Sequence, residues 1–280
     1  MPKEVKVHKD KVYYPEGNAS RDLYVNRKMS KRQWRTSPRR VAGIDLTAPR
    51  ICGTQCVAVS ESTGRRCRRR TCVDYRYCSQ HLAREKHLMV GKSKRLHELG
   101  VNGLGLYAYN PELGKLKKDA HGFPVKEMAL RVFRKMPPSV KRDKMMDYVI
   151  GDYGGEVLTT HEKNARYEDP DDMETAAYAE GGTNFVLDGL SAASAVSYSN
   201  ESLDVARLMR DSSDQRDFKS RYQAAGARDR ASKVQTKQIN HMIRMLPTKD
   251  IYQGEEILWH YGPGYWGTEG MKRVITGSGW

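Results

Sequence analysis

The sequence has little apolar material and no long apolar run. Of its 280 residues, 38% are hydrophobic and 30% are charged, and only four are phenylalanine. No stretch approaches the roughly 20 apolar residues that a membrane-spanning helix requires, and no secretory signal is expected at the start. Collagen-like, transmembrane and disulfide-rich secreted classes are excluded, and no membrane partner is expected. Sixteen tyrosines and four tryptophans can still build a core.

Acidic residues are scarce in the first third of the chain. Residues 1–100 hold 24 Lys and Arg against 9 Asp and Glu, whereas residues 101–280 hold 25 of each, so the net charge of +15 lies in the first third. We interpret residues 1–50 as a basic, extended or partly disordered arm. Such a segment favours nucleic acid or an acidic protein surface, and the alternative is a solvated tail without a partner. The basic run 31–40 indicates an intracellular, nuclear protein, although such runs are common.

Cysteine is absent after Cys78, and all five cysteines fall between Cys52 and Cys78. An odd, clustered set favours metal ligation in a reducing compartment over disulfides. The segment 51–90 also resembles a short zinc-binding motif that ends in Tyr-Cys-x-x-His-Leu. Thiolates and an imidazole suit tetrahedral, structural zinc. The preferred ligands are Cys56, Cys67, Cys78 and His81. Two alternatives stay open: scattered reduced cysteines without metal, and a rival ligand set of Cys52, Cys56, Cys67 and Cys72.

The rest of the chain alternates short strand-like runs with glycine-rich turns, which is typical of small sheets rather than of a βαβ array. We therefore expect a mainly β fold with short helices (α+β). The expected strands are Gly105–Tyr109, Tyr148–Gly151, Val157–Thr160, Phe185–Leu187 and Glu256–Trp259. The expected helical regions are a short helix ending at His87, a helix plus loop at 161–180, and helical stretches within a polar insertion at 203–238, with a C-terminal tail at 267–280.

Four motifs follow one another after residue 100. They are Gly103-Leu104-Gly105, Tyr153-Gly154-Gly155-Glu156, Asn200-Glu201-Ser202 twelve residues beyond Asp188, and Gly254-Glu255-Glu256 running on to Tyr261-Gly262. Each alone has a structural explanation as a turn, a strand end or a loop cap. In this order and spacing they resemble the SET-domain family of protein lysine methyltransferases, over about residues 101–266.

The resemblance implies a β-clip-like fold of small sheets and the cofactor S-adenosylmethionine, which donates a methyl group to a lysine amine. It places Tyr261 and Tyr153 in the catalytic site. It assigns cofactor contacts to Leu104, Gly105, Asn200, Glu201 and Trp266. Trp259 occupies a position where, in the family, aromatic bulk affects the number of methyl groups added, and we expect it to favour lower methylation. The expected partner is a protein with a target lysine, such as histone or another basic chromatin protein.

Three residues depart from the family pattern: Ser197 replaces an arginine, Glu201 a histidine and His260 an aspartate. The family's C-terminal zinc cluster is also absent, because no cysteine follows Cys78. A competing alignment places the Asn-His-Ser motif on 206–212 but loses its asparagine. Two functions therefore remain: a lysine methyltransferase, or a non-catalytic module that binds nucleic acid or protein through its zinc segment on a degenerate SET fold.

Overall fold

The computed structural model describes residues 55–100 except 61, 70, 72, 73 and 75, then 103–153, 155–158, 178–180, 186–188, 194–239 and 242–266. It also describes three short strands near the N-terminus, β1 (Glu4–Lys6), β2 (Val12–Tyr13) and β3 (Lys28–Ser30). The expectations for the rest of residues 1–50, for most of 161–180 and for the tail 267–280 lie outside the described residues.

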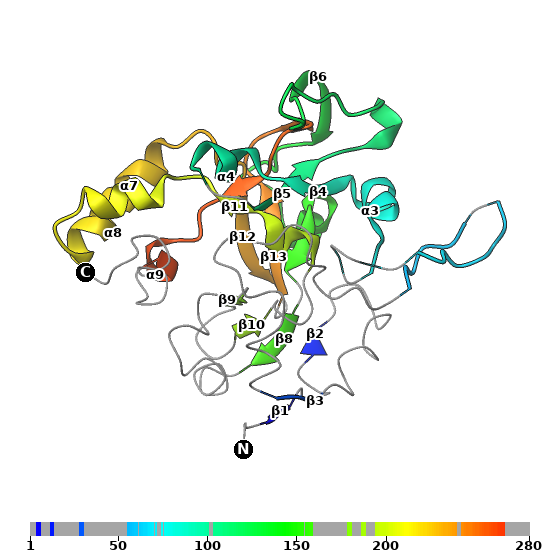
Figure 1. Cartoon of the computed structure of the whole chain (residues 1–280), viewed down its shortest axis with the longest axis horizontal. Coiled ribbons are helices and arrows are strands. Elements are labelled where there is room, and N and C mark those ends of the chain that lie inside the picture. The colour runs from blue at the N-terminus through cyan, green and yellow to red at the C-terminus, as the bar shows by residue number, and fades with distance from the viewer. Residues whose placement is uncertain are drawn as a thin grey trace.

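The described chain forms several small sheets with short helices between them, which confirms the expected fold class (Figure 1). The sheets pair β4 (Leu88–Lys92) with β5 (Leu104–Ala108), β6 (Glu127–Phe133) with β14 (Ile251–Gln253), and β11 (Asn200–Glu201) with β15 (Leu258–Trp259). A three-stranded sheet has the order β12 (Val234–Ile239), β13 (Met242–Pro247), β7 (Gly151–Tyr153). A four-stranded sheet has the order β2, β8 (Gly155–Leu158), β10 (Val186–Asp188), β9 (Tyr178–Glu180).

The helices are short. They are α3 (Ser79–Lys86), α4 (Lys94–Glu98), α7 (Val205–Arg210), α8 (Gln215–Arg228) and α9 (Pro263–Trp266), with 3-10 helices η2 (Pro111–Leu113), η3 (Arg142–Tyr148) and η4 (Ala195–Tyr198). Helix α3 confirms the helix expected to end at His87. Its last carbonyls are satisfied because His87, in the left-handed region at φ 54°, donates its amide N–H to Ala83 and Leu82. Among the helices of the described residues, none is long and apolar enough to cross a bilayer.

The main core lies where the β4–β5 hairpin, η4 and the β7–β13 pair meet. Leu88, Leu106, Ile150, Val196 and Met245 are each no more than 2% exposed there. Apolar side chains from segments far apart in the sequence thus form one hydrophobic cluster. The partly buried Leu104 and Trp259 pack against its margin. This core fixes β5, η4 and β15 relative to one another, and each of them leads directly to residues of the candidate site.

A second, smaller core belongs to the polar segment 203–238. Val205 and Met209 of α7 pack against Phe218 and Tyr222 of α8, and Trp266 of α9 covers this cluster. Helices α7 and α8 lie together at one end of the molecule (Figure 1). The expected helical stretches are therefore present, but the segment ends in strand β12, which pairs along its whole length with β13.

One expected strand is wrong. Residues 142–148 form the 3-10 helix η3, and the strand begins only at Gly151. The apolar residues Val149 and Ile150 mark the point where the chain enters the core. The Ile150 amide donates a hydrogen bond to the carbonyl oxygen of Met245 at 3.0 Å, just before strand β7 begins. The other expected strands that fall on described residues are present, shifted by one or two positions.

Candidate functional site

The first part of the site joins β5 to β11. The Asn200 side chain donates from Nδ2 to the carbonyl oxygen of Leu104 at 2.8 Å and lies 3.5 Å from Oε1 of Glu256. Asn200 reaches this place because β11 runs parallel to β15, with Asn200 opposite Leu258. Two of the predicted cofactor residues, almost a hundred positions apart, are thus in direct contact. The competing alignment on 206–212 instead falls on helix α7.

Gly105 is required by this packing. A Cβ at Gly105 would lie 2.3 Å from Oε1 of Glu256 and 3.1 Å from the Cα of Ser93. The first contact would force Glu256 to shift, and the second, to backbone, is tighter than ordinary Cβ contacts, so the glycine permits close approach of the chain's own segments. The structure therefore gives Gly105 a packing role that the Gly-x-Gly pattern alone did not reveal.

Glu256 is a buried carboxylate that the sequence reasoning left without a role. It accepts from the Ser93 hydroxyl at 2.6 Å and from the Arg95 amide at 3.0 Å, and the Tyr107 hydroxyl lies 3.4 Å away. Burial raises the pKa of Glu256, and hydrogen bonds from Ser93 and Arg95 oppose this change. Burial and the neighbouring Glu256 raise the pKa of Tyr107 as well. A protonatable acid therefore lies beside Leu104 and Asn200.

The second part of the site is a group of three aromatic side chains near the end of the described chain. Trp259 donates its indole N–H, and Tyr261 its hydroxyl, to the same acceptor, the carbonyl oxygen of Ser199, at 3.1 and 2.7 Å. Their rings meet edge to face at 5.1 Å. On its other side Tyr261 stacks on Trp266, with centroids 5.4 Å apart and planes 5° apart. The phenol of Tyr261 is thus held directly beside Asn200.

Glu201 holds these aromatic residues in place. One carboxylate oxygen accepts from the Tyr222 hydroxyl at 2.5 Å, from the Tyr261 amide at 2.9 Å and from the Trp266 indole at 2.9 Å. The other accepts from the amides of Ser202 and Leu203 and faces Nδ1 of His260 at 3.1 Å. The carboxylate predicted to bind cofactor is therefore occupied by donors of this chain.

The hydrogen bonds also decide the charge of Glu201. Burial opposes ionisation, but the bonds from His260, Tyr222, Trp266 and the Tyr261 amide outweigh it and lower the pKa of Glu201. The pKa of Tyr222 is raised by burial and by the neighbouring Glu201 charge. Glu201 is therefore an ionised acceptor that Tyr222, a residue of the polar insertion, stabilises as a donor.

His260 lies between two carboxylates. Its Nδ1 faces Glu201 at 3.1 Å and its Nε2 faces Asp229 at 3.5 Å, while the Ser202 hydroxyl lies 3.1 Å from Nδ1. The hydrogen bond with Glu201 raises the pKa of His260, burial opposes it, and Asp229 raises it further. At the position where the family has an aspartate, this chain thus has an imidazole that favours its cationic form.

Tyr153 is a residue of the main core. It is 7% exposed on β7, opposite Ile243 of β13, within the main core whose margin includes Leu104 and Trp259. The structure therefore connects Leu104, Asn200, Glu201, Tyr261 and Trp266 through direct contacts, and it places Tyr153 in the core beside them.

The four preferred metal ligands come together in the N-terminal part. The ligand atoms of Cys56, Cys67, Cys78 and His81 all lie within 4.8 Å of one another. Nδ1 of His81 is 3.4 Å from the Cys56 sulfur and 3.2 Å from the Cys78 sulfur. In a tetrahedral zinc site, bond lengths of about 2.1 and 2.3 Å give nitrogen–sulfur edges of roughly 3.5 Å. The donor set therefore fits zinc.

Local structure explains this convergence. Cys78 is the N-cap of α3 and His81 lies in its first turn, so the Cys-x-x-His pair faces one side. Burial raises the pKa of the Cys56 thiol to about 11, and burial together with Arg84 lowers the pKa of His81. A neutral imidazole is the form that ligates a metal. Cys52 and Cys72 of the rival set lie outside the described residues.

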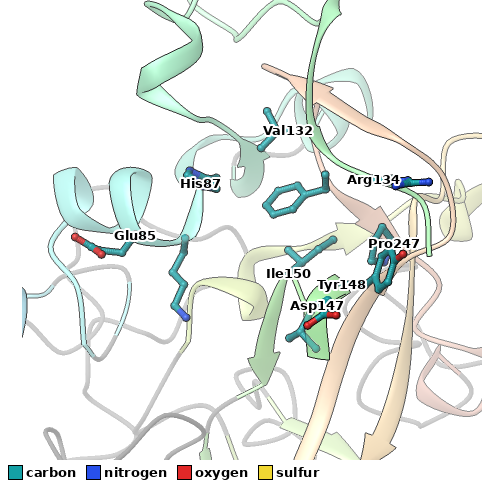
Figure 2. A pocket seen from close by; sticks show the side chains of 11 residues that line it. Glu85, His87, Val132, Arg134, Asp147, Tyr148, Ile150 and Pro247 are labelled. Carbon is teal, nitrogen blue, oxygen red and sulfur yellow. The ribbon is translucent and has the colours of Figure 1, made fainter. Parts of the chain in front are cut away.

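A further pocket of about 540 Å³ lies between the end of α3, β6 and η3 (Figure 2). Phe133, Ile150 and Pro247 line it together with His87 and Tyr148, and none of the sequence-predicted site residues does. Nδ1 of His87 is buried there and has no hydrogen-bond partner among the described residues. The lining comes from four separated segments, so no single motif could have indicated this pocket.

The comparisons with known proteins give limited help. No protein family model and no curated protein matches the chain. Among solved structures, the chain is similar to part of the polycomb repressive complex 2 (PRC2) of Chaetomium thermophilum, with 16% sequence identity and a TM-score of 0.35. The match covers 62% of this chain but only 15% of that one.

Proposed function

We propose that the chain is an S-adenosylmethionine-dependent protein lysine methyltransferase. One observation carries the proposal: β15 and the residues after it return beside β11, so that Tyr261 and Trp266 lie against the segment of Asn200, whose side chain bonds to Leu104. These are the residues that the resemblance assigned to donor and catalysis. If the motifs form one site, these residues must lie close together in the fold. Residues that share these motifs by chance need not do so.

The groups around Tyr261 suit a cationic methyl donor. The carbonyl oxygen of Ser199 and the stacked rings of Tyr261 and Trp266 favour positive charge. When bound, S-adenosylmethionine supplies the activated methyl group. We assign contacts with it to Leu104, Asn200 and Trp266. Because its carboxylate is occupied, Glu201 can contact the cofactor only through its backbone, and its side chain positions Tyr261 and Trp266.

The chain's own residues would prepare the lysine. With a reference pKa of about 10.4, the amine must lose its proton before it can attack, and an apolar aromatic surrounding favours the neutral form. Tyr261 would orient this amine, because its hydroxyl is fixed by donation to Ser199 and retains lone pairs toward the substrate. Tyr153 would contribute to the wall of the lysine channel. The rate of in-line methyl transfer depends mainly on such positioning and the step needs no metal. We therefore assign zinc a structural role.

The resemblance extends the proposal to the substrate. We expect histone or another basic chromatin protein to carry the target lysine, and hence a nuclear location. The alternative function is a non-catalytic binding module on a degenerate SET fold. Glu201 and His260 at altered family positions favour it in principle, but both belong to a fully hydrogen-bonded network that supports Tyr261. The residues that differ from the family pattern therefore support Tyr261 through a hydrogen-bond network of their own.

The test is a methyl-transfer assay with labelled S-adenosylmethionine, core histones and several other basic proteins. We expect transfer by the wild type and a loss on the order of 100-fold in Tyr261→Phe, which keeps the ring but removes the hydroxyl. The matched control is Tyr252→Phe on β14, where the ring contacts Lys126 away from the site. Absence of both transfer and cofactor binding in the wild type would establish the non-catalytic alternative.

A further inference from the structure

A hairpin rich in arginine extends from the body of the protein. We call residues 55–69 the arginine hairpin. Val59 and Arg66 form an antiparallel bridge, Ser60 donates its amide to Arg65 at 2.9 Å, and Gly64 turns the chain at φ 62°. Figure 1 shows this blue-cyan loop reaching outward, at the end of the molecule opposite α7 and α8. The hairpin is therefore accessible at a distance from the candidate methyl-transfer site.

The base of the arginine hairpin coincides with the candidate metal site. Cys56 and Cys67 lie on its two arms, and their amides donate to Arg69 and Ala58 at 2.8 Å. The Arg66 guanidinium bonds across the hairpin to the carbonyls of Cys56 and Gln55 at 2.9 and 2.7 Å. A metal bound by Cys56 and Cys67 would join the two arms and fix the direction of the hairpin.

The remaining arginines of the hairpin have no described anionic partner. Arg65, Arg68 and Arg69 are exposed, and no described carboxylate forms a salt bridge with them. Elsewhere on the surface, Arg207 and Arg221 pair with acids one helical turn away. Residues 55–69 contain four arginines and a single acid, Glu61. Three guanidinium groups are thus concentrated and left open to an external anion.

The composition of the hairpin selects the kind of anion. Protein partners are bound through tryptophan, tyrosine and arginine anchors in well-packed, desolvated pockets, and single-stranded nucleic acid through stacked aromatic rings. Residues 55–69 contain no aromatic residue, and Val59, 52% exposed, is the large apolar side chain that the described hairpin exposes. Arginines with the hydroxyls of Ser62 and Thr63 are instead typical contacts to a phosphate backbone.

We propose that the arginine hairpin is a metal-clipped contact element for the sugar–phosphate backbone of double-stranded nucleic acid. The element binds without regard to sequence, because phosphate contacts position a protein but do not read bases. It acts independently of methyl transfer and would hold the protein on a duplex while the Tyr261 site remains free.

The test measures fluorescence anisotropy of the full-length, zinc-loaded protein with a labelled duplex of 20 base pairs, as DNA and as RNA, at several salt concentrations. The variant Arg65→Ala/Arg68→Ala/Arg69→Ala should bind at least about tenfold more weakly. Its slope of log affinity against log salt should be smaller by about 2.7, because each lost phosphate contact removes roughly 0.9. The control Arg207→Ala/Arg216→Ala/Arg221→Ala removes the same charge at the opposite end and should bind almost as wild type.

Three outcomes would overturn the proposal: an equal loss in both triple variants, absence of duplex binding, or wild-type binding to a single strand or to polyglutamate as tight as to the duplex.

The metal is tested separately. Chelation should weaken binding to about the level of the hairpin triple variant and zinc should restore it, whereas full affinity of the stripped protein would remove the metal from the proposal. Methyl transfer to a free peptide by the same variants distinguishes this proposal from the methyltransferase proposal, because it should stay unchanged in both.

Discussion

The two functional regions of this protein are stabilised in opposite ways. The Tyr261 site rests on the main core and on Glu201, a buried carboxylate surrounded by donors. Among its described residues, the metal segment forms a small cluster of its own, in which Cys56, Ala58 and Cys78 are buried. Burial of this size cannot order a segment alone, but a metal can. Each region should therefore fail under a perturbation that leaves the other intact.

The largest expected effect is loss of the metal. Cys78→Ser removes a thiolate from the Cys3His set and should reduce bound zinc to background, with local unfolding of residues 55–78. Zinc supplies about 10–16 kcal/mol of apparent binding free energy in comparable small fingers. Zinc content by mass spectrometry and local hydrogen exchange measure both effects. Cys72→Ser, from the rival ligand set, is the matched control and should retain zinc; full retention in Cys78→Ser would show the ligand assignment to be wrong.

Next in size is the loss of the buried acceptor in the other region. Glu201→Gln replaces one carboxylate oxygen by an NH2 donor, which would face the donors of Tyr261, Trp266 or His260. The free energy of unfolding should fall by about 3 kcal/mol, and methyl transfer should fall with it. Tyr222→Phe removes a single donor and should cost about 2 kcal/mol. Urea unfolding measures both; Glu98→Gln, whose carboxylate is 52% exposed, should change nothing.

A smaller effect concerns pH and has a defined sign. The pKa of His260 is raised in the folded protein, so its contribution to stability is complete below its ordinary pKa of 6.5 and is lost as pH rises through the folded value. The groups that face it are Glu201, Asp229, the Ser202 hydroxyl and the Tyr222 ring. The wild type should therefore lose more stability between pH 6 and pH 9 than His260→Gln. Equal losses in urea unfolding would contradict the charge that we assign to His260.

The smallest expected effect is on the product. The Trp259 indole is fixed by Ser199 and lies edge to face with Tyr261, where its bulk would limit the space for added methyl groups. Trp259→Phe should shift the product from lower to higher methylation at a similar total rate. Mass spectrometry of a methylated peptide measures this shift, and mainly trimethyl-lysine from the wild type would refute it.

The sequence predicted best the features whose signal is local. The Cys-x-x-His pair indicated the start of α3, and short apolar runs between glycines indicated β5, β8 and β15. The motif order brought Asn200 to Leu104 correctly, although the two lie 96 residues apart. The resemblance placed Glu201 in the site as a cofactor contact, whereas its side chain in the structure accepts hydrogen bonds from Tyr222 and Trp266. These partners come from the insertion and from the last helix, and no motif in the sequence relates either of them to Glu201. The role of Glu256 was missed for the same reason.

The most direct measurement of the central claim is hydrogen–deuterium exchange of the wild-type protein with and without S-adenosylmethionine. The account predicts simultaneous protection of three separate stretches, 103–108, 199–203 and 258–266, which are the segments that contain Leu104, Asn200 and Tyr261. Protection of none of them, or protection only around the pocket that contains His87 and Phe133, would contradict a methyl-donor site at Tyr261.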